Sequence, residues 1–557
     1  MITTRSGGPS SVAAPLLGLL ASSPASSPAL LAAAAAGTTV AAVVLGTLLW
    51  QSKADSKKRD GHRSSCGKDP ILPEELSSLL LSSNDGSGIQ NTNSDCVYLD
   101  YNGTTPVHPL VLAAMLPFLT VHFGNPSSGH HYGAAPRQAI QTARRSLLRL
   151  LTPVKKNNSS SNDDNKDNPV FEAIGDGSSD LPLDSLWFTG CGTESDNLAI
   201  LLALEHADTT KTKETTASSP VDPSVSNGTK GSGAKNMKHI VTTNVEHPAI
   251  QKCLDHLVST RSDVEVTYVP VGPDGRVSAK DVEDAMRPNT VLVTVMLANN
   301  ESGALMPLKE IGRICQNRGV LLHTDAAQAC GKVDLRQLLG NDDTDDNDGS
   351  GGSRLWPDLI TLVGHKMGAP KGIAALFVRP GLHSSKKPLM LFGGGQEFGT
   401  RGGTENVPYM VGMGKAAELC LQHMDRTVQH TESLRTRLLE TLRTRLDGVT
   451  EIRPNGPSDP KHRLPNTLSI GLRHVQSGNL LDALKHKVAA SAGAACHSDS
   501  AGSVSAVLRA MQVPDDYARG TLRLTVGPST THEEVERAAC IIADEAKKQL
   551  QSRSFSQ

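Results

Sequence analysis

The sequence lacks two features that mark common classes of protein. Its 55 basic and 57 acidic residues leave a formal net charge of -2, so no strong field gathers nucleic acid or an anionic surface. Its nine cysteines include no CxxC pair, which argues against a disulfide framework or a zinc site and favours a reducing compartment. We therefore expect no nucleic-acid partner and no metal.

The N-terminal 68 residues also lack charge over a long stretch, with none between Arg5 and Lys53. Residues 29–50 are about long enough to span a bilayer, and basic residues follow directly. One interpretation is a membrane anchor that leaves the rest of the chain on the cytosolic side of a membrane or in the cytosol. Because the segment is rich in Ser and Ala, the second is a cleaved transit peptide for a mitochondrion or another organelle, and the third is a low-complexity tail.

From about residue 95 the chain has the pattern of an α/β protein. Short apolar runs alternate with helical segments, and several runs are apolar throughout, as strands buried on both faces must be. This pattern predicts a mostly parallel sheet covered on both sides, with ligands bound at the carboxyl ends of its strands. The expected strands are residues 185–190, 239–245, 264–271, 290–297, 320–325, 358–363 and 372–378.

The length of the chain predicts two domains with additional segments. The predicted parts are a targeting or membrane-anchor segment (1–68), a linker (69–94), a large cofactor-binding domain (95–380) and a smaller C-terminal α/β domain (381–552). Three inserts are rich in Asn, Asp, Ser and Gly, and we expect them to be disordered surface loops. They are residues 155–168, 207–235 and 340–353.

Three of the expected strands end in residues that carry chemistry. Lys366 follows one strand, where removal from water lowers the pKa of an amine enough for it to react with an aldehyde. Asp325 ends a second strand and suits a protonated pyridine nitrogen, although a buried ion pair or a helix N-cap would also explain it. Gly192 and Thr193 follow a third strand at the start of a helix, where a phosphate cradle or an ordinary capped helix would fit.

With these residues in place, the chain resembles the class V aminotransferase family of fold-type I pyridoxal-phosphate enzymes. The resemblance covers roughly residues 97–540 and is most specific to the branch of cysteine desulfurases and selenocysteine lyases. It rests on the ordered motifs YLDYNGTTP, FGNPSS, GTES, TTNVEH, MLANNESG, HTDAAQ, GHK, LFGGGQE, RGGTEN, LPNT, GAACHSD and LRLTVG.

The resemblance implies pyridoxal 5'-phosphate as the cofactor, bound to Lys366 as a Schiff base, with Asp325 on the pyridine nitrogen. It implies further cofactor contacts in three groups: His247 stacks on the ring and helps to move protons, Asn300 and Gln328 hydrogen-bond the phenolic oxygen, and Gly192, Thr193 and His365 hold the phosphate. Thr404 matches a phosphate ligand supplied by the neighbouring subunit, so the family implies a homodimer with shared active sites.

For the substrate, the resemblance implies that Arg523 clamps the carboxylate of a small amino acid and that Asn102 lies beside it. Cys496 matches the thiol that attacks the substrate sulfur or selenium, although a cysteine among Ala and Gly is more often a small buried hydrophobe. Lys366, Cys496 and His247 are therefore the expected catalytic residues.

Three functions remain open from the sequence. The motifs GAACHSD, MLFGGGQE and VMLANNESG resemble selenocysteine lyase most, which converts L-selenocysteine to L-alanine and releases selenium through a Cys selenopersulfide. The alternative is a cysteine desulfurase that forms a Cys persulfide and passes sulfur to an acceptor protein. The third is an inactive homologue that serves as a membrane-tethered platform.

Overall fold

The fold is described from a computed structural model of the chain, which places residues 95–152, 181–217, 237–340, 355–383, 389–492 and 504–554. Residues 87–557 form one compact unit. The N-terminal segment lies outside the described residues, so the anchor, the transit peptide and the linker stay predictions. Within the described ranges, no helix combines the length and apolar character needed to cross a bilayer.

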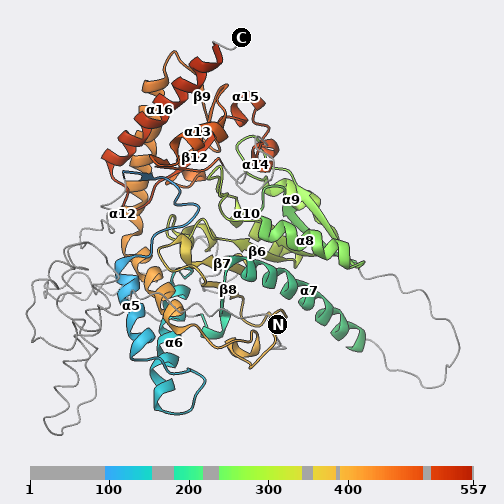
Figure 1. Cartoon of the computed structure of the whole chain (residues 1–557). Coiled ribbons are helices and arrows are strands. Elements are labelled where there is room, and N and C mark those ends of the chain that lie inside the picture. The colour runs from blue at the N-terminus through green and yellow to red at the C-terminus, as the bar shows by residue number, and fades with distance from the viewer. Residues whose placement is uncertain are drawn as a thin grey trace, which may run out of the picture. The chain divides into compact units, whose positions relative to one another are not determined.

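A seven-stranded, mostly parallel sheet organises the larger part of the fold and confirms the predicted α/β class (Figure 1). Its spatial order is β2-β8-β7-β6-β5-β3-β4, and only β8 runs antiparallel to its neighbours. The strands are β2 (Leu186–Thr189), β3 (Lys238–Thr243), β4 (Val264–Val269), β5 (Thr290–Thr294), β6 (Leu321–Asp325), β7 (Leu359–Val363) and β8 (Ala374–Val378). Each lies inside or within one residue of a strand predicted from the sequence.

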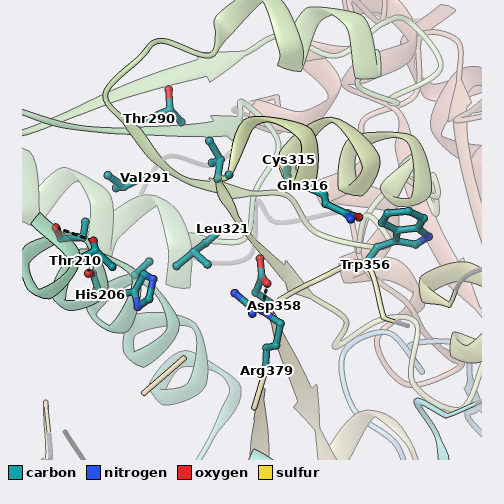
Figure 2. A pocket seen from close by; sticks show the side chains of 14 residues that line it. His206, Thr210, Thr290, Val291, Cys315, Gln316, Leu321, Trp356, Asp358 and Arg379 are labelled. Atoms are coloured by element: carbon teal, nitrogen blue, oxygen red, sulfur yellow. Dashed lines mark hydrogen bonds and ion pairs between the residues drawn. The ribbon is translucent and has the colours of Figure 1, made fainter. Parts of the chain in front are cut away.

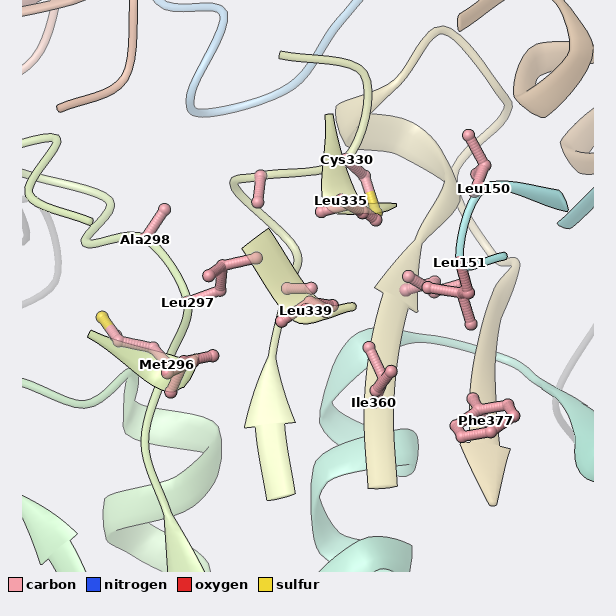
Figure 3. Packing of buried hydrophobic residues seen from close by; sticks show 14 of the residues in the cluster. Leu150, Leu151, Met296, Leu297, Ala298, Cys330, Leu335, Leu339, Ile360 and Phe377 are labelled. Carbon is pink, nitrogen blue, oxygen red and sulfur yellow. The ribbon is translucent and has the colours of Figure 1, made fainter. Parts of the chain in front are cut away.

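Both faces of this sheet are buried because successive side chains of a strand point to opposite sides. In β7, Leu359 joins the apolar cluster under helices α7 and α8, and Ile360 joins the larger cluster on the other face. In β8, Leu376 joins the same cluster as Leu359, and Phe377 joins the larger cluster with Ile360. Figure 3 shows Ile360 and Phe377 on the face that the larger cluster covers. This two-sided burial explains why the strands read as continuous apolar runs.

Helices pack around the sheet and continue into the C-terminal part of the chain. Helix α12 packs against α5 and α6 and, further along its length, against α16. The helices are α5 (Pro109–Thr120), α6 (Ala134–Arg149), α7 (Gly192–Ala217), α8 (Pro248–Thr260), α9 (Ala279–Ala285), α10 (Leu308–Arg318), α11 (Leu335–Leu339), α12 (Val407–Leu446), α13 (Ser477–Leu484), α14 (Ala506–Ala510), α15 (Asp515–Ala518) and α16 (His532–Ser554).

Two small sheets lie beside these C-terminal helices. An antiparallel sheet has the order β12-β10-β9, and a parallel pair joins β1 to β11. Their strands are β1 (Val97–Tyr98), β9 (Ile452–Asn455), β10 (Thr467–Leu472), β11 (Val488–Ala489) and β12 (Thr521–Thr525). Strand β1 thus brings the start of the described chain to the C-terminal strands. The predicted division at residues 380 and 381 stays a prediction.

The predicted start of the second polar insert, at residue 207, is wrong. Residues 207–217 were expected to be part of a disordered loop, but they form the last turns of α7. Once a helix has begun, each further residue adds a backbone hydrogen bond at low cost, and Thr210 also donates its hydroxyl to the His206 carbonyl. At the third insert, Gly340 forms an isolated antiparallel backbone bridge with Leu355, and residues 341–353 lie outside the described residues. The first insert lies outside the described residues.

A buried ion pair fixes the segment that precedes α12. Arg144 Nη2 of α6 lies 2.6 Å from Glu397 Oε1, and the two side chains are only 6% and 1% exposed. The other Glu397 oxygen accepts the Phe188 backbone N–H at 2.8 Å. The guanidinium also lies over the Phe398 ring, 4.7 Å from its centroid. This pair therefore holds residues 397 and 398 against β2.

We predict that Arg144→Met lowers the free energy of unfolding by about 3–5 kcal/mol, because it leaves the Glu397 carboxylate buried without its cation. The matched control is Arg437→Met, since Arg437 pairs with Glu536 on the surface, where the two side chains are 52% and 47% exposed. That control should cost less than about 1 kcal/mol. Urea unfolding of the full chain measures both, and equal losses would contradict the assignment of Arg144 as a buried anchor.

Candidate active site

The three predicted strand ends meet at one edge of the large sheet. Asp325 is the last residue of β6, and Lys366 lies in the short turn that follows the neighbouring strand β7. Helix α7 begins at Gly192, where a Cβ atom would come within 2.7 Å of Val363 Cγ2 at the end of β7. Only glycine permits this close approach. The start of α7 and its free N–H groups therefore lie beside the lysine turn.

The amino group of Lys366 points at the backbone of the segment after β1. Its Nζ donates to the carbonyl oxygens of Asn102 and Gly103, at 2.5 and 3.0 Å. Burial lowers the pKa of Lys366 to about 8, and the positive charge of Arg523 adds to this shift, while Asp325 and Asp100 oppose it. Part of the lysine population is therefore a neutral nucleophile near physiological pH.

Asp325 lies behind this amine with 8% of its surface exposed. One carboxylate oxygen accepts the Ala327 backbone N–H at 2.8 Å, so the N-cap-like contact that the sequence left open is present. Burial raises the pKa of Asp325, whereas that hydrogen bond and the charges of His247 and Lys366 lower it. A carboxylate in this position gains stability from a cation placed next to it, as a protonated pyridine nitrogen would be.

His247 lies at the N-cap of α8, where its Nδ1 accepts the Ala249 N–H at 3.2 Å. Its surroundings lower its pKa by removal from water, while the Asp325 charge opposes the shift and the Lys366 charge adds to it. The lowered pKa favours the neutral imidazole, which can both accept and donate a proton. His247 thus lies close enough to Asp325 and Lys366 for their charges to act on it, and its position over the cofactor ring stays a prediction.

The two predicted substrate residues, Arg523 and Asn102, meet at the backbone oxygen of Asn300. Arg523 of β12 donates to the backbone oxygen of Asn300 at 3.1 Å and pairs with Asp100 at 2.7 Å. The Asn102 side chain donates to the same Asn300 oxygen at 3.3 Å. The Arg523 side chain is 9% exposed, and its Nε has no hydrogen-bond partner among the described residues. Each terminal nitrogen of the guanidinium also carries a second N–H, and these could bind a substrate carboxylate.

The residues predicted to bind the phosphate lie on three different parts of the fold. His365 contacts the Thr104 hydroxyl at 3.1 Å, and burial with the nearby lysine charges lowers its pKa to about 4. It is therefore neutral near pH 7 and would hold a phosphate by hydrogen bonding. Thr193 is exposed in the first turn of α7, and Thr404 is exposed in the loop before α12. Arg401 of that loop pairs with Glu194 of α7 at 2.5 Å.

Cys496 lies outside the described residues, but the described chain on both sides of it contacts the site. Ser491 pairs with Arg523 in a backbone bridge. On the other side, the Ser505 hydroxyl donates to Glu301 Oε2 at 2.6 Å, next to Asn300 in the sequence. The role of Cys496 therefore stays a prediction.

Three groups in the site were missed by sequence reasoning. Lys332 is buried, and its Nζ contacts Asn102 Oδ1 at 3.0 Å and Gln328 Oε1 at 2.6 Å. Asp196 and Glu246 are buried carboxyl groups whose charges act on each other, and burial raises the pKa of Glu246 to about 8. Lys332 had a signal in the sequence, because it follows Gln328 by four residues in AAQACGK.

A separate cavity of about 390 Å³ lies at the opposite edge of the large sheet, where strands begin. Its lining includes Thr290 and Leu321, which start β5 and β6, and Figure 2 shows Asp358 bonded to Arg379 in it. None of the residues predicted for the active site lines this cavity. The predicted chemistry is thus confined to the carboxyl edge.

The chain is similar to known proteins over most of its length. The Aminotransferase class-V family pattern matches residues 212–342 and 351–538. A cysteine desulfurase of Trichormus azollae is 36% identical over 442 residues, which cover 79% of this chain and 90% of the relative. A selenocysteine lyase of Bos taurus is 38% identical over 455 residues, which cover 79% and 91%. A solved NifS-like protein aligns with a TM-score of 0.60 at 27% identity, over 83% of this chain and 100% of that chain.

The fold and the comparisons define a fold-type I pyridoxal-phosphate enzyme. The chain belongs to the class V aminotransferase family, within the group that contains cysteine desulfurases and selenocysteine lyases. The predicted fold class, family and cofactor are confirmed. The relatives include enzymes named for both substrates, so they do not choose between selenium and sulfur.

The described residues fit pyridoxal 5'-phosphate. They supply a buried amine with a lowered pKa at Lys366, a buried carboxyl group at Asp325 and a helix start at Gly192 that has no room for a side chain. These are the groups needed to hold an aldehyde, a pyridine nitrogen and a phosphate, respectively. Among the described residues, no cluster of His, Cys, Asp and Glu has the form of a metal site.

We predict that cofactor-free enzyme captures pyridoxal phosphate faster as pH rises through about 8, because only the neutral amine of Lys366 attacks an aldehyde. The Asp100 charge raises this pKa, so Asp100→Asn should move the midpoint to lower pH. Asp255→Asn is the matched control, since Asp255 is 57% exposed on α8. Stopped-flow absorbance measures the midpoint. A midpoint in the ordinary lysine range would refute the lowered pKa.

Proposed function

We propose that this enzyme is a selenocysteine lyase that converts L-selenocysteine to L-alanine and transfers selenium to Cys496. The observation that carries the proposal is that Lys366, which donates to the Asn102 carbonyl, lies close enough to Asp325 and Arg523 for their charges to shift its pKa. Arg523 and the Asn102 side chain in turn share the Asn300 carbonyl. This arrangement joins an imine-forming amine, a carboxylate for a pyridine nitrogen and a clamp for an amino-acid carboxylate.

The residues divide the reaction between them. Arg523 binds the substrate carboxylate through the remaining N–H groups of its two terminal nitrogens, and Asp100 and the Asn300 carbonyl hold the guanidinium in place. Bound pyridoxal phosphate supplies an electron sink for cleavage next to the substrate α-carbon. Lys366 then holds or returns a proton at that carbon, as its lowered pKa allows. His247 is placed to move a second proton.

Cys496 acts on the chalcogen atom. Its thiolate sulfur forms a bond to the substrate selenium as the carbon–selenium bond breaks, and the electron pair of that bond remains with the carbon. Protonation of the carbon gives alanine, and selenium remains on the protein as a selenopersulfide. Selenium accepts attack by a thiolate more readily than sulfur does, so the transfer needs a well-placed Cys496 thiolate and a general acid that protonates the carbon.

The motifs around Cys496 and the glycine-rich loop favour selenium, and the Bos taurus relative is named a selenocysteine lyase. The second candidate is a cysteine desulfurase, which the name of the Trichormus azollae relative supports. In that case Cys496 would carry a persulfide and pass sulfur to an acceptor protein. The two functions share every residue assigned above and differ in the substrate.

We predict that the full chain releases alanine from L-selenocysteine with a kcat/KM at least about tenfold above that for L-cysteine, a difference of about 1.4 kcal/mol. Cys496→Ser should abolish selenium transfer because an alcohol cannot accept it. The matched control is Cys253→Ser, since Cys253 is a half-buried cysteine of α8. Equal specificity constants for the two amino acids would establish the cysteine desulfurase instead.

We further propose that the enzyme works as a homodimer in which Thr404 reaches the phosphate of the other subunit. The loop before α12 that carries Thr404 also exposes large apolar side chains, with Phe392 79% and Leu391 43% exposed. Burial of such side chains favours association. We expect Phe392→Glu to yield monomers in analytical ultracentrifugation and to weaken cofactor retention. A dimer that persists in this variant would place the interface elsewhere.

A further inference from the structure

A second buried lysine stands behind the cofactor site. After β6 the chain makes a helical turn that places Gln328 and Lys332, four residues apart, on the same side. Gly331 makes the reversal possible with a φ of 72°, and a Cβ there would lie 2.9 Å from Cys420 Sγ. Lys332 is only 7% exposed. Its burial is therefore built into the turn.

The hydrogen bonds of Lys332 fix the orientation of Gln328. A lysine ammonium offers only donors, so the atom of Gln328 that it contacts at 2.6 Å is the carbonyl oxygen. The amide nitrogen of Gln328 must then face the opposite way, and it donates one hydrogen to the Asn102 carbonyl at 3.0 Å. That carbonyl also accepts from Lys366. The second amide hydrogen remains for a ligand beside Lys366.

The same ammonium fixes the Asn102 side chain. Lys332 and Asn466 both donate to Asn102 Oδ1, at 3.0 and 3.1 Å. The Asn102 amide nitrogen therefore faces the Asn300 carbonyl and the Thr467 hydroxyl, at 3.3 and 3.0 Å. Lys332 thus determines in which direction the side-chain amides of Gln328 and Asn102 present their oxygen and their N–H groups.

The charges around Lys332 are mixed. Burial lowers its pKa well below the usual lysine range, and the charges of Lys366 and Arg523 add to this shift, while Cys330 and Asp100 oppose it. The neutral amine keeps two N–H donors, which suffice for the contacts to Gln328 Oε1 and Asn102 Oδ1, whereas the ammonium, which has no acceptor, excludes the opposite orientation of either amide.

We propose that Lys332 is a positioning residue that makes Gln328 present an N–H, and not its carbonyl oxygen, to the phenolic oxygen of the cofactor. This inference rests on the proposed placement of Gln328 at that oxygen. A donated hydrogen bond stabilises the anionic form of a phenolic oxygen. Lys332 therefore lowers the pH at which the bound cofactor changes its absorption, without touching the cofactor itself.

The test is a pH titration of the visible absorption of the bound cofactor in purified full-length variants. We expect Lys332→Met, which keeps the length but removes the donor, to raise the midpoint by about one pH unit. Lys332→Arg, which keeps donors at this position, should restore the midpoint at least in part. Lys252→Met is the matched control, since Lys252 is a lysine of α8 with 81% of its side chain exposed and should leave the midpoint unchanged.

Two further variants separate positioning from a general structural role. Gln328→Leu should raise the midpoint as Lys332→Met does, and the double variant should add nothing, because Lys332 acts through Gln328. If Lys332→Met fails to fold, Gln328→Glu keeps the Lys332 contact but has no N–H to donate, and it should raise the midpoint as well.

An unchanged midpoint in Lys332→Met, or additive shifts in the double variant, would overturn the inference. Either outcome would leave the proposed function intact, because that function is judged on alanine release by the unmodified enzyme. Loss of that activity with a shifted midpoint would instead overturn the function and keep the positioning role.

Discussion

The backbone of Asn102 is the contact on which the two halves of the active site depend. Its carbonyl accepts from Lys366 and Gln328 of the large sheet, whereas its N–H donates to the Thr525 hydroxyl of the small antiparallel sheet at 3.0 Å. Its side chain reaches Thr467 in the neighbouring strand. The small sheet therefore determines where the reactive amine of the large sheet points, and any shift between the sheets would move the site.

The site concentrates charge in a region from which water is largely removed. Lys366, Lys332 and Arg523 supply positive charge, and Asp100 and Asp325 supply negative charge. Burial lowers the pKa values of Lys366 and Lys332 and raises that of Asp325. Such a site is poised to accept a ligand that brings its own positive nitrogen and anionic oxygens, because the ligand completes pairs that the protein leaves partly open.

Much of this arrangement could be predicted from the sequence because its signals are local. Burial on both faces made the strands apolar throughout, and parallel strands bring their carboxyl ends to one edge, so Lys366 and Asp325 had to lie close together. The end of α7 was misplaced because its polar residues resemble a loop, although an established helix carries them at low cost.

The remaining contacts could not be read from local patterns. The role of Lys332 depends on Asn102, which is 230 residues away in the sequence, and the pairing of Arg523 with Asp100 spans 423 residues. Such long-range contacts arise only when the sheets pack together. The motif YLDYNGTTP contains Asp100, and Lys332 lies four residues after the motif HTDAAQ, but only the packed chain shows which atoms they meet.

The central claim is that Lys366 holds the cofactor. Because a second lysine, Lys332, lies in the same site, identifying the lysine that carries the cofactor tests this claim most directly. Borohydride reduction of the cofactor-loaded enzyme fixes the cofactor permanently to the amine that holds it, and peptide mass spectrometry then identifies that residue. The account predicts the pyridoxyl group on Lys366 alone, because only this amine lies at the end of β7 with its pKa near 8. Labelling of Lys332, or of neither lysine, would contradict it.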